Sequence, residues 1–237
     1  MGIKVVAIVP AAGIGQRFSG SVRKSLASVA GMPVLIHTLK RLQQAGPVTE
    51  IIPVVRTEDT DRVSEMVREY ELDKIRRVVP GGRERQDSVY NALKQIKEES
   101  VVMVHDGVRP VISTELIEKL IKELDGFDGV VPAVPVKDTL KKAGDDGTVL
   151  STEARDKLWS VQTPQVFPLN VIKKAYDSAF AEGFYATDDS ALVERTGGRV
   201  RIIEGSPFNI KITTPEDLDM VEFLLAFTRK PRHLQRG

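Results

Sequence analysis

Short apolar segments typical of buried strands alternate with amphipathic segments typical of helices along most of this sequence. The strand-like segments in the first two thirds of the chain are residues 4–9, 50–55, 75–79, 100–104 and 128–136. Strands separated by helices predict an α/β fold, with a mostly parallel sheet and helices on both faces. Such sheets bind ligands beyond the carboxyl ends of their strands.

The helix-like segments carry recognisable start and stop signals. Pro33 and Gly46 bound the first helix, Ser113 precedes the helix at 114–124, and Thr214-Pro215 starts a C-terminal helix. Pro53 inside its strand indicates a sheet edge or an irregularity. The remaining predicted helices are residues 59–71, 84–99, about 169–181 and 188–197, and the remaining predicted strands are 199–205 and 209–213.

The alternation breaks at about residues 136–160. This segment has a turn signal at Asp145-Asp146-Gly147 between two runs of mixed polarity, which predicts a β-hairpin. Because it holds few apolar residues, we expect it to project from the body. An isolated hairpin is marginally stable in water, so a second subunit is the natural partner surface. The alternative is a hairpin that folds back as a lid or an edge.

A glycine-rich turn follows the first strand, in the sequence VPAAGIGQRF. A dinucleotide-binding turn needs a third glycine, but Phe18 stands at that position, and no acidic residue follows before Glu50. A mononucleotide P-loop needs a lysine where Ser21 stands. The turn is therefore either a different kind of phosphate-binding loop or a tight strand–helix connection without a ligand.

The distribution of charge favours an anion site at this turn. The whole chain has 34 basic and 33 acidic residues, yet residues 1–49 contain six basic residues and no acidic one. Backbone N–H groups exposed at glycines, together with nearby cations, form a cradle for anions. Arg17 and Lys24, within or just after the turn, are the cations most suited to this role.

Composition excludes several other classes of protein. The net charge of +1 indicates neither a nucleic-acid nor a membrane partner, and the first apolar run is too short for a signal sequence or a membrane span. The absence of cysteine rules out disulfides, thiol catalysis and cysteine-bound metals, and it is compatible with a cytoplasmic protein. At 237 residues, one α/β domain covering 1–237 is expected.

Asp106, in the sequence HDGVRP after the fourth strand, is a candidate Mg²⁺ ligand, because one or two carboxylates and substrate phosphates commonly hold this ion. Taken alone, this position favours a loop-capping aspartate. Arg109 could bind phosphate or pair with Asp106. Lys211 lies on a predicted strand opposite two isoleucines, as either a ligand or an exposed lysine.

Together these segments resemble the 2-C-methyl-D-erythritol 4-phosphate cytidylyltransferases of the non-mevalonate route to isoprenoids. The resemblance covers nearly the whole chain in ordered motifs: PAAGIGQRF with a following lysine, GGRERQDSV, HDGVRP, PVKDT, EARDKLWSVQTPQVF, TDDSALVE and NIKITTPEDL. Two segments depart from the commonest family pattern. Arg23-Lys24-Ser25 replaces Pro-Lys-Gln, and Gly107-Val108 replaces Ala-Ala.

The resemblance implies a single-domain, Rossmann-like nucleotidyltransferase that dimerises through the hairpin arm and uses CTP and Mg²⁺. It implies that Arg17 and Lys24 stabilise the transition state, that Arg155 and Lys211 position methylerythritol phosphate, and that Asp106 binds the metal. The residues implied in substrate contacts are Arg109, Thr139 and Thr187 at the acceptor, Gly82 and Ser88 at the cytosine, the Ala11, Ala12, Gly13 and Gly15 backbone at the triphosphate, and Gly107 in the nucleotide site.

The implied reaction agrees with the residues available. A phosphate monoester has a second pKa near ~6, so the nucleophile is already ionised and needs no general base. Two alternatives remain open at this point. A ribitol 5-phosphate cytidylyltransferase would perform the same reaction on another acceptor, and a catalytically silent regulator would bind the nucleotide without transferring it.

Overall fold

The computed structural model describes residues 3–13 and 23–229. Within them, an eight-stranded sheet has the order β10-β7-β11-β6-β1-β4-β5, with β12 also paired to β7. Its strands are β1 (Val5–Pro10), β4 (Glu50–Val55), β5 (Val79–Pro80), β6 (Val101–Val104), β7 (Gly129–Pro135), β10 (Trp159–Val161), β11 (Gln165–Pro168) and β12 (Val200–Glu204). The β1, β4, β5 and β6 strands are mutually parallel, as are β7 and β12, whereas β10 and β11 run antiparallel to their neighbours.

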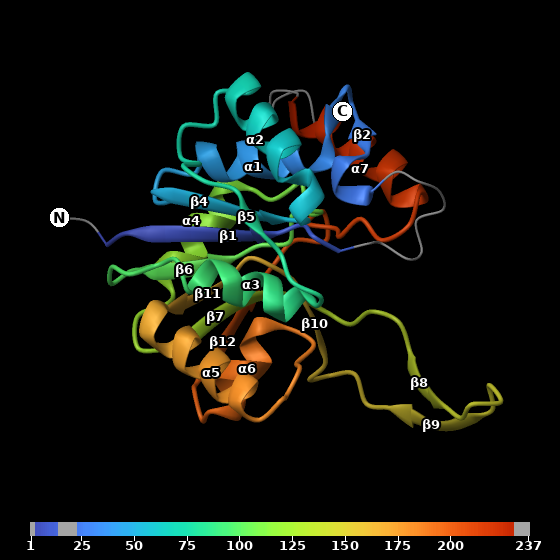
Figure 1. Cartoon of the computed structure of the whole chain (residues 1–237). Coiled ribbons are helices and arrows are strands. Elements are labelled where there is room, and N and C mark those ends of the chain that lie inside the picture. The colour runs from blue at the N-terminus through green and yellow to red at the C-terminus, as the bar shows by residue number, and fades with distance from the viewer. Residues whose placement is uncertain (1–2, 14–22, 230–237) are drawn as a thin grey trace.

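Helices cover both faces of this sheet, as predicted (Figure 1). The helices are α1 (Val34–Gln44), α2 (Thr60–Glu69), α3 (Arg85–Leu93), α4 (Thr114–Lys122), α5 (Leu169–Ala181), α6 (Asp189–Arg195) and α7 (Glu216–Arg229). Alternate residues of β1 serve the two faces: Ala7 packs in one core cluster with α1, α2 and α4, and Ile8 packs in the other with α3, α5 and α6.

A smaller cluster lies where α7 meets short elements near the glycine turn. It joins residues of α7, such as Val221, to Val29, Val108 and Ile212. The short elements are β2 (Ser28–Val29) and β3 (Met32–Pro33), which pair with each other, and the 3₁₀ turns η1 (Lys24–Leu26) and η2 (Thr57–Asp59). This cluster anchors the segments that carry Lys24 and Lys211.

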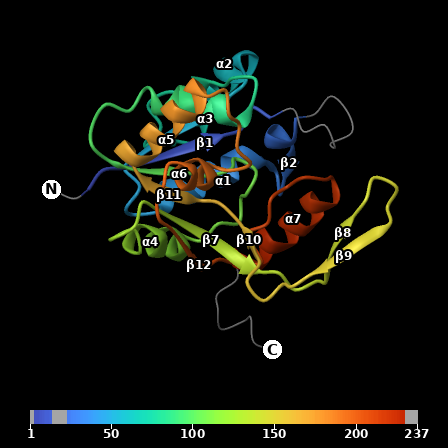
Figure 2. The same cartoon turned by 90° about the horizontal axis from the view of Figure 1, so that it is seen from below.

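The hairpin predicted at 136–160 is present as β8 (Leu140–Ala143) and β9 (Val149–Glu153). Gly147 occupies its turn at a φ of 80°, a backbone conformation that favours glycine. Within the described residues, the two strands pair only with each other, and the arm extends away from the body (Figures 1 and 2). The lid or folded-back alternative is therefore wrong for this chain on its own.

Several predicted elements differ from those observed. The strand expected at 75–79 is reduced to β5, because it lies at the sheet edge with no strand beyond it in the described chain. The helix expected at 84–99 ends at Leu93, where consecutive turns carry Ile96 into the core. Pro53 fits its position next to that edge, since β4 pairs with β5 only at Val54 and Val55.

Candidate active site

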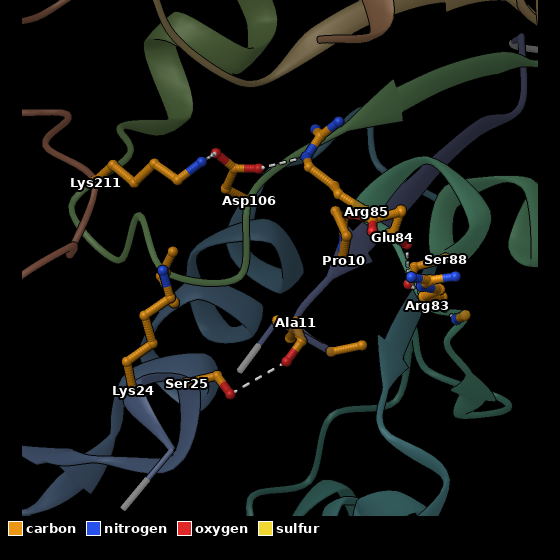
Figure 3. Close-up of a pocket in the computed structure, with 14 residues that line it drawn as sticks. Pro10, Ala11, Lys24, Ser25, Arg83, Glu84, Arg85, Ser88, Asp106 and Lys211 are labelled. Atoms are coloured by element: carbon orange, nitrogen blue, oxygen red, sulfur yellow. Dashed lines mark hydrogen bonds and ion pairs between the residues drawn. The ribbon is translucent and has the colours of Figure 1, made fainter. Parts of the chain in front are cut away.

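The carboxyl ends of β1, β5 and β6 meet at one cavity, which holds Ala11–Gly13 of the glycine turn and Asp106. The turn is tied to the neighbouring strand by the Ala11 N–H, which donates to the Val54 carbonyl at 2.7 Å. The cavity is lined by Pro10, Ala11, Ala12, Gly13, Lys24, Ser25, Gly82, Arg83, Glu84, Arg85, Ser88, Asp106, Val108 and Lys211 (Figure 3). Gly15 and Arg17, two predicted members of the site, lie outside the described residues.

The segment that carries Lys24 is attached to the strand ends on both sides. Ser25 donates from its hydroxyl to the Ala11 carbonyl at 3.3 Å. Arg23 forms ion pairs with Glu58, at 3.0 Å, and with Asp59 of η2, and its φ of −72° is one that proline would also adopt. Both departures from the family pattern around Lys24 thus make contacts that hold this segment beside the turn.

Gly82 and Ser88 form the opposite wall of the cavity. The Gly82 N–H donates to the Ser88 hydroxyl oxygen at 3.1 Å, and that hydroxyl donates to the Glu84 carbonyl at 3.1 Å. A capping box between Glu84 and Asp87 starts α3 at this point. Gly107 does not line the cavity, but a Cβ there would lie 2.9 Å from the Ala11 side chain, so this glycine supports the turn from behind.

Asp106 is surrounded by three cations. Its Oδ1 lies 3.1 Å from Arg85 Nε, and its Oδ2 lies 2.9 Å from Lys211 Nζ and 3.5 Å from Arg109 Nε. Burial alone would raise the pKa of the Asp106 carboxyl, but Arg85, Lys211 and Arg109 together hold that pKa well below its usual range. The carboxylate is therefore ionised at every physiological pH, and the cluster retains an excess of positive charge.

A buried hydrogen-bond network holds the backbone of Asp106 in place. The Asp106 N–H donates to the Thr163 hydroxyl at 3.0 Å, and that hydroxyl lies 3.1 Å from His105 Nδ1. His105 Nε2 lies 3.2 Å from the Arg109 carbonyl, which can only accept, so Nε2 carries the proton and Nδ1 accepts from Thr163. Burial lowers the pKa of His105 to about 4, which keeps the ring neutral.

Arg109 is a buried member of this network. Only 9% of the residue is exposed, and its guanidinium donates to the Asn209 carbonyl at 2.7 Å as well as facing Asp106. Of the two roles left open for Arg109, pairing with Asp106 is the one observed in this structure.

The strand predicted at 209–213 does not form, although Lys211 still faces the site. Residues 209–213 make no ladder, and the Ile212 N–H instead donates to the Val108 carbonyl at 2.9 Å. Burial of Ile212 against α7 fixes this segment, and Lys211 extends from it toward Asp106 (Figure 3). The backbone contact of residues 209–213 with the loop at Val108, and not pairing in a sheet, therefore orients Lys211.

Thr187 lies in a neighbouring cavity. That cavity is lined by Arg83, Glu84, Arg85, Gln86, Tyr176, Tyr185, Ala186, Thr187, Asp188 and Asp189. Because Arg83, Glu84 and Arg85 line both cavities, the two spaces share this wall. The predicted acceptor residue is thus adjacent to the site, on the far side of Arg85.

Thr139 and Arg155 are not brought to the cavity within one chain. Both are exposed at the base of the arm, where the Arg155 guanidinium donates to the Lys137 carbonyl. The sequence groups them with the site only through the family resemblance.

The residues that line the cavity but were not predicted from the sequence are Pro10, Ser25, Arg83, Glu84, Arg85 and Val108. Among them, Arg85 makes the ion pair with Asp106. Arg85 is the first residue of α3, and a cation at a helix N-terminus is unfavourable unless carboxylates compensate it. An arginine at this position therefore indicates that carboxylates lie nearby. Asp106 and Asp189 are those carboxylates.

The residues present fit a magnesium ion bound mainly through its substrate. Asp106 supplies an ionised oxygen ligand at the cavity wall, and a carboxylate can accept more contacts than Asp106 has here. Among residues 3–13 and 23–229, no group of three or more histidine or acidic side chains could hold a metal ion. The protein would thus provide one carboxylate, and substrate phosphates would provide further ligands.

Comparison with known proteins decides the family. The sequence profile of the 2-C-methyl-D-erythritol 4-phosphate cytidylyltransferases matches residues 5–227. The chain belongs to this family. The family enzyme of Syntrophus aciditrophicus (strain SB) is 45% identical over 224 residues, covering 94% of this chain and 96% of the relative. That of Desulforamulus reducens is 44% identical over 223 residues, covering 93% and 95%.

The fold of the chain is that of solved members of the family. The crystal structure of 4-diphosphocytidyl-2C-methyl-D-erythritol synthase from Anaerococcus prevotii DSM 20548 superimposes with a TM-score of 0.83 and 36% sequence identity, covering 95% of this chain and 97% of the other. The predicted nucleotidyltransferase fold is therefore confirmed. In the part of the chain that the structure describes, no helix is both long and apolar enough to cross a membrane.

Proposed function

We propose that the chain transfers CMP from CTP to 2-C-methyl-D-erythritol 4-phosphate and releases pyrophosphate, as a step in making isoprenoid precursors. The observation that carries this proposal is the cavity in which the glycine turn, Lys24 and the Asp106–Lys211 pair meet. Family membership favours methylerythritol phosphate over ribitol 5-phosphate as the acceptor. We place the activity in the cytoplasm, because CTP is an intracellular nucleotide.

The reaction needs electrostatic stabilisation more than proton transfer. An oxygen of the acceptor phosphate attacks the α-phosphorus of CTP, a new P–O bond forms, and the bond to the β-phosphate bridging oxygen breaks, so that pyrophosphate leaves. The neutral, buried His105 is not placed to act as a base, and none is required because the nucleophile is ionised. Fixed cations lower the barrier by opposing the charge that develops.

The nucleotide binds across the two walls of the cavity. The Ala11–Gly15 backbone binds the triphosphate, Gly82 and Ser88 contact the cytosine, and Gly107 supports the turn. Lys24 and Arg17 neutralise the phosphates during transfer. Lys24 suits this role because Arg23 and Ser25 hold its segment against the strand ends.

The acceptor phosphate binds at Lys211, together with Arg155. Lys211 suits this role because it is 38% exposed in its side chain and points into the cavity. Arg109 and Thr187 complete the acceptor site from the same chain, and Thr139 completes it from the arm.

Mg²⁺ is the cofactor that the reaction class calls for. Asp106 would hold it together with phosphate oxygens of CTP, and the bound ion would neutralise charge on the triphosphate. Mn²⁺ or another divalent ion of similar coordination would serve the same purpose.

The enzyme acts as a homodimer in which each arm completes the partner's acceptor site. Thr139 and Arg155 are exposed on the arm, and neither lines the cavity of its own chain. The arm also exposes Val149 and Leu150, at 56% and 62%, which a second subunit would cover. The body, residues 1–237 apart from the arm, forms one nucleotidyltransferase domain.

A pyrophosphate-release assay tests the proposal. CTP and three other nucleoside triphosphates are each combined with methylerythritol phosphate or ribitol 5-phosphate, with and without Mg²⁺. We expect release only with CTP and Mg²⁺, and a higher kcat/KM for methylerythritol phosphate. Preference for ribitol 5-phosphate would overturn the acceptor, and CTP binding without any release would indicate a silent regulator.

A further inference from the structure

Arg85 joins the active-site carboxylate to a second, fully buried carboxylate. Its Nε lies 3.1 Å from Asp106 Oδ1, and its NH2 lies 2.8 Å from Asp189 Oδ2. Asp189, the first residue of α6, is completely buried. The guanidinium therefore connects the end of β6 to α6, which is far away in the sequence, and it does so beside the cavity that holds Lys24 and Lys211 (Figure 3).

The far end of this chain of contacts is fixed in the core. Tyr176 of α5, 1% exposed, donates its hydroxyl to Asp189 Oδ1. Its ring packs beside Tyr90 and Phe180, and burial raises the pKa of its hydroxyl, so it remains a donor. Since Tyr176 and Arg85 occupy one oxygen each of Asp189, the carboxylate has a single orientation, and Arg85 has one as well.

The three cations around Asp106 differ in how firmly they are held. Arg109 already donates to the Asn209 carbonyl, and its Nε is 3.5 Å from Asp106. Lys211 is a flexible side chain, 38% exposed, that reaches Asp106 through one ammonium group. Arg85 is held at both ends by planar, charge-assisted contacts, which a lysine cannot reproduce.

This difference matters once a phosphate enters the site. A substrate phosphate competes with Asp106 for the Lys211 ammonium, and Lys211 can turn toward it because its side chain is 38% exposed and lines the cavity. Asp106 then loses its shortest contact. The contact from Arg85 persists, because Asp189 and Tyr176 prevent the guanidinium from following the phosphate.

We propose that Arg85 is a positioning residue, anchored by Asp189 and Tyr176, that keeps Asp106 in place while Lys211 exchanges from Asp106 to substrate phosphate. The inference rests on the proposed function. It predicts that damage anywhere along Tyr176, Asp189 and Arg85 slows transfer through Asp106, even though neither Asp189 nor Tyr176 lines the cavity that holds Lys24 and Lys211.

The test compares three variants of the full chain with a matched control. Arg85→Lys keeps the charge but cannot bridge two carboxylates, Asp189→Asn weakens the anchor, and Tyr176→Phe removes one hydroxyl. The control is Arg77→Lys, which alters a comparable contact, Arg77 to the buried Glu50 at 3.1 Å, at the opposite end of β4. Each protein is examined for melting temperature, for CTP affinity by calorimetry without divalent metal, and for kcat and KM.

We expect Arg85→Lys to lower kcat by about 10- to 100-fold, the scale of a misplaced catalytic group. The loss of kcat should be smaller in Asp189→Asn and smallest, about threefold, in Tyr176→Phe. The CTP affinity measured without metal should stay within about threefold of wild type in all three variants. Arg77→Lys should retain wild-type kcat whatever its melting temperature.

Three results would overturn the inference. The first is a folded Arg85→Lys variant with wild-type kcat. The second is a loss of kcat in Arg77→Lys as well, with kcat in every variant falling in proportion to the fall in melting temperature. The third applies if Arg85→Lys does not fold, and is wild-type kcat in both Asp189→Asn and Tyr176→Phe. A wild-type enzyme that releases no pyrophosphate would instead contradict the proposed function.

Discussion

Lys211 Nζ lies 2.9 Å from Asp106 Oδ2, so the cation assigned to the acceptor phosphate is paired with the carboxylate assigned to the metal. The Lys211 ammonium, together with Arg85 and Arg109, holds the pKa of the Asp106 carboxyl well below its usual range in the free enzyme. In the exchange proposed above, a substrate phosphate draws the Lys211 ammonium away from the Asp106 carboxylate. The pair thus keeps the cavity ordered before binding and makes both charges available afterwards.

Lys211→Ala should bind CTP almost normally but transfer CMP very slowly. Loss of one preorganised donor typically lowers turnover by about 10²–10³-fold. Asp106 keeps Arg85 and Arg109, so we expect the variant to fold. Steady-state kinetics and calorimetry with CTP check this, with Lys122→Ala, at an exposed position of α4, as the control. A variant with wild-type kcat would exclude Lys211 from the acceptor site.

Lys24→Ala should lose turnover on the same scale of about 10²–10³-fold, because this lysine and Ala11–Gly13 line the cavity where the triphosphate is expected. Its segment stays attached through Arg23 and Ser25, so the melting temperature should change little. Lys119→Ala, on the surface of α4, provides the matched control. Retention of near wild-type kcat would show that Lys24 plays no part in transfer.

Features that depend on the local pattern of residues could be predicted from the sequence. The helix expected at about 169–181 is observed as Leu169–Ala181, and Ser113 caps α4 by accepting the Leu116 N–H as its spacing predicts. The pairing of Asp106 with Arg109 was foreseen as one of two roles, because the residues are three apart. These features require little knowledge of distant parts of the chain.

Features that depend on strand order were not predictable. Arg85 and Asp189 are 104 residues apart, and they meet only because α3 and α6 cover the same face of the sheet. Residues 209–213 have the alternation of a strand, yet the hydrophobic contact of Ile212 with α7 and Val108 decides their conformation. The ion pairs of Arg23 with η2 likewise depend on how β4 is placed beside the turn.

Folding stability should fall as the pH decreases from about 6.5 toward 4, because His105 is buried in its neutral form. Its pKa is about 4 in the folded chain, against an ordinary value of 6.5, so the unfolded chain binds the extra proton first. The contribution of neutral His105 to the free energy of unfolding is fully present above the pKa of the unfolded chain. It declines as the pH falls below that value, by at most about 3 kcal/mol at pH 4.

Urea unfolding between pH 7 and pH 4.5 measures this effect of His105. The pKa values of the Glu50 and Asp106 carboxyls are lowered from ordinary values of 4.5 and 3.8, so these groups add to the slope mainly below about pH 5. His105→Asn should remove most of the slope while lowering stability at pH 7. An equally steep slope in that variant would assign the pH dependence to other groups.

Gly81→Ala should weaken CTP binding by distorting both walls of the cavity. A Cβ at Gly81 would lie 2.6 Å from the Ala12 Cβ and 2.8 Å from the Ser88 hydroxyl oxygen, so one or both must move. We expect the dissociation constant for CTP to rise by about tenfold or more, equivalent to about 1.4 kcal/mol. Gly46→Ala is the control, because nothing lies within 4 Å of a Cβ there. Equal CTP affinity in the two variants would contradict the assigned nucleotide site.

Mixing two inactive proteins should restore activity if the arm completes a neighbour's site. Arg155→Ala damages only the arm, and Lys24→Ala damages only the cavity. In a heterodimer with crossed arms, one site receives both defects and the other receives neither. Random exchange of subunits makes half of the dimers mixed, so about a quarter of the sites should recover.

The measurement is pyrophosphate release after the two variants are mixed and allowed to exchange subunits, with each variant alone as the baseline. Sedimentation must first show that the chain is a dimer, since a monomer would exclude a shared site. Activity that never rises above the two baselines, despite proven exchange of labelled subunits, would place Arg155 at the site of its own chain. Recovery requires the intact arm and the intact cavity to come from different subunits, which the crossing arrangement alone provides.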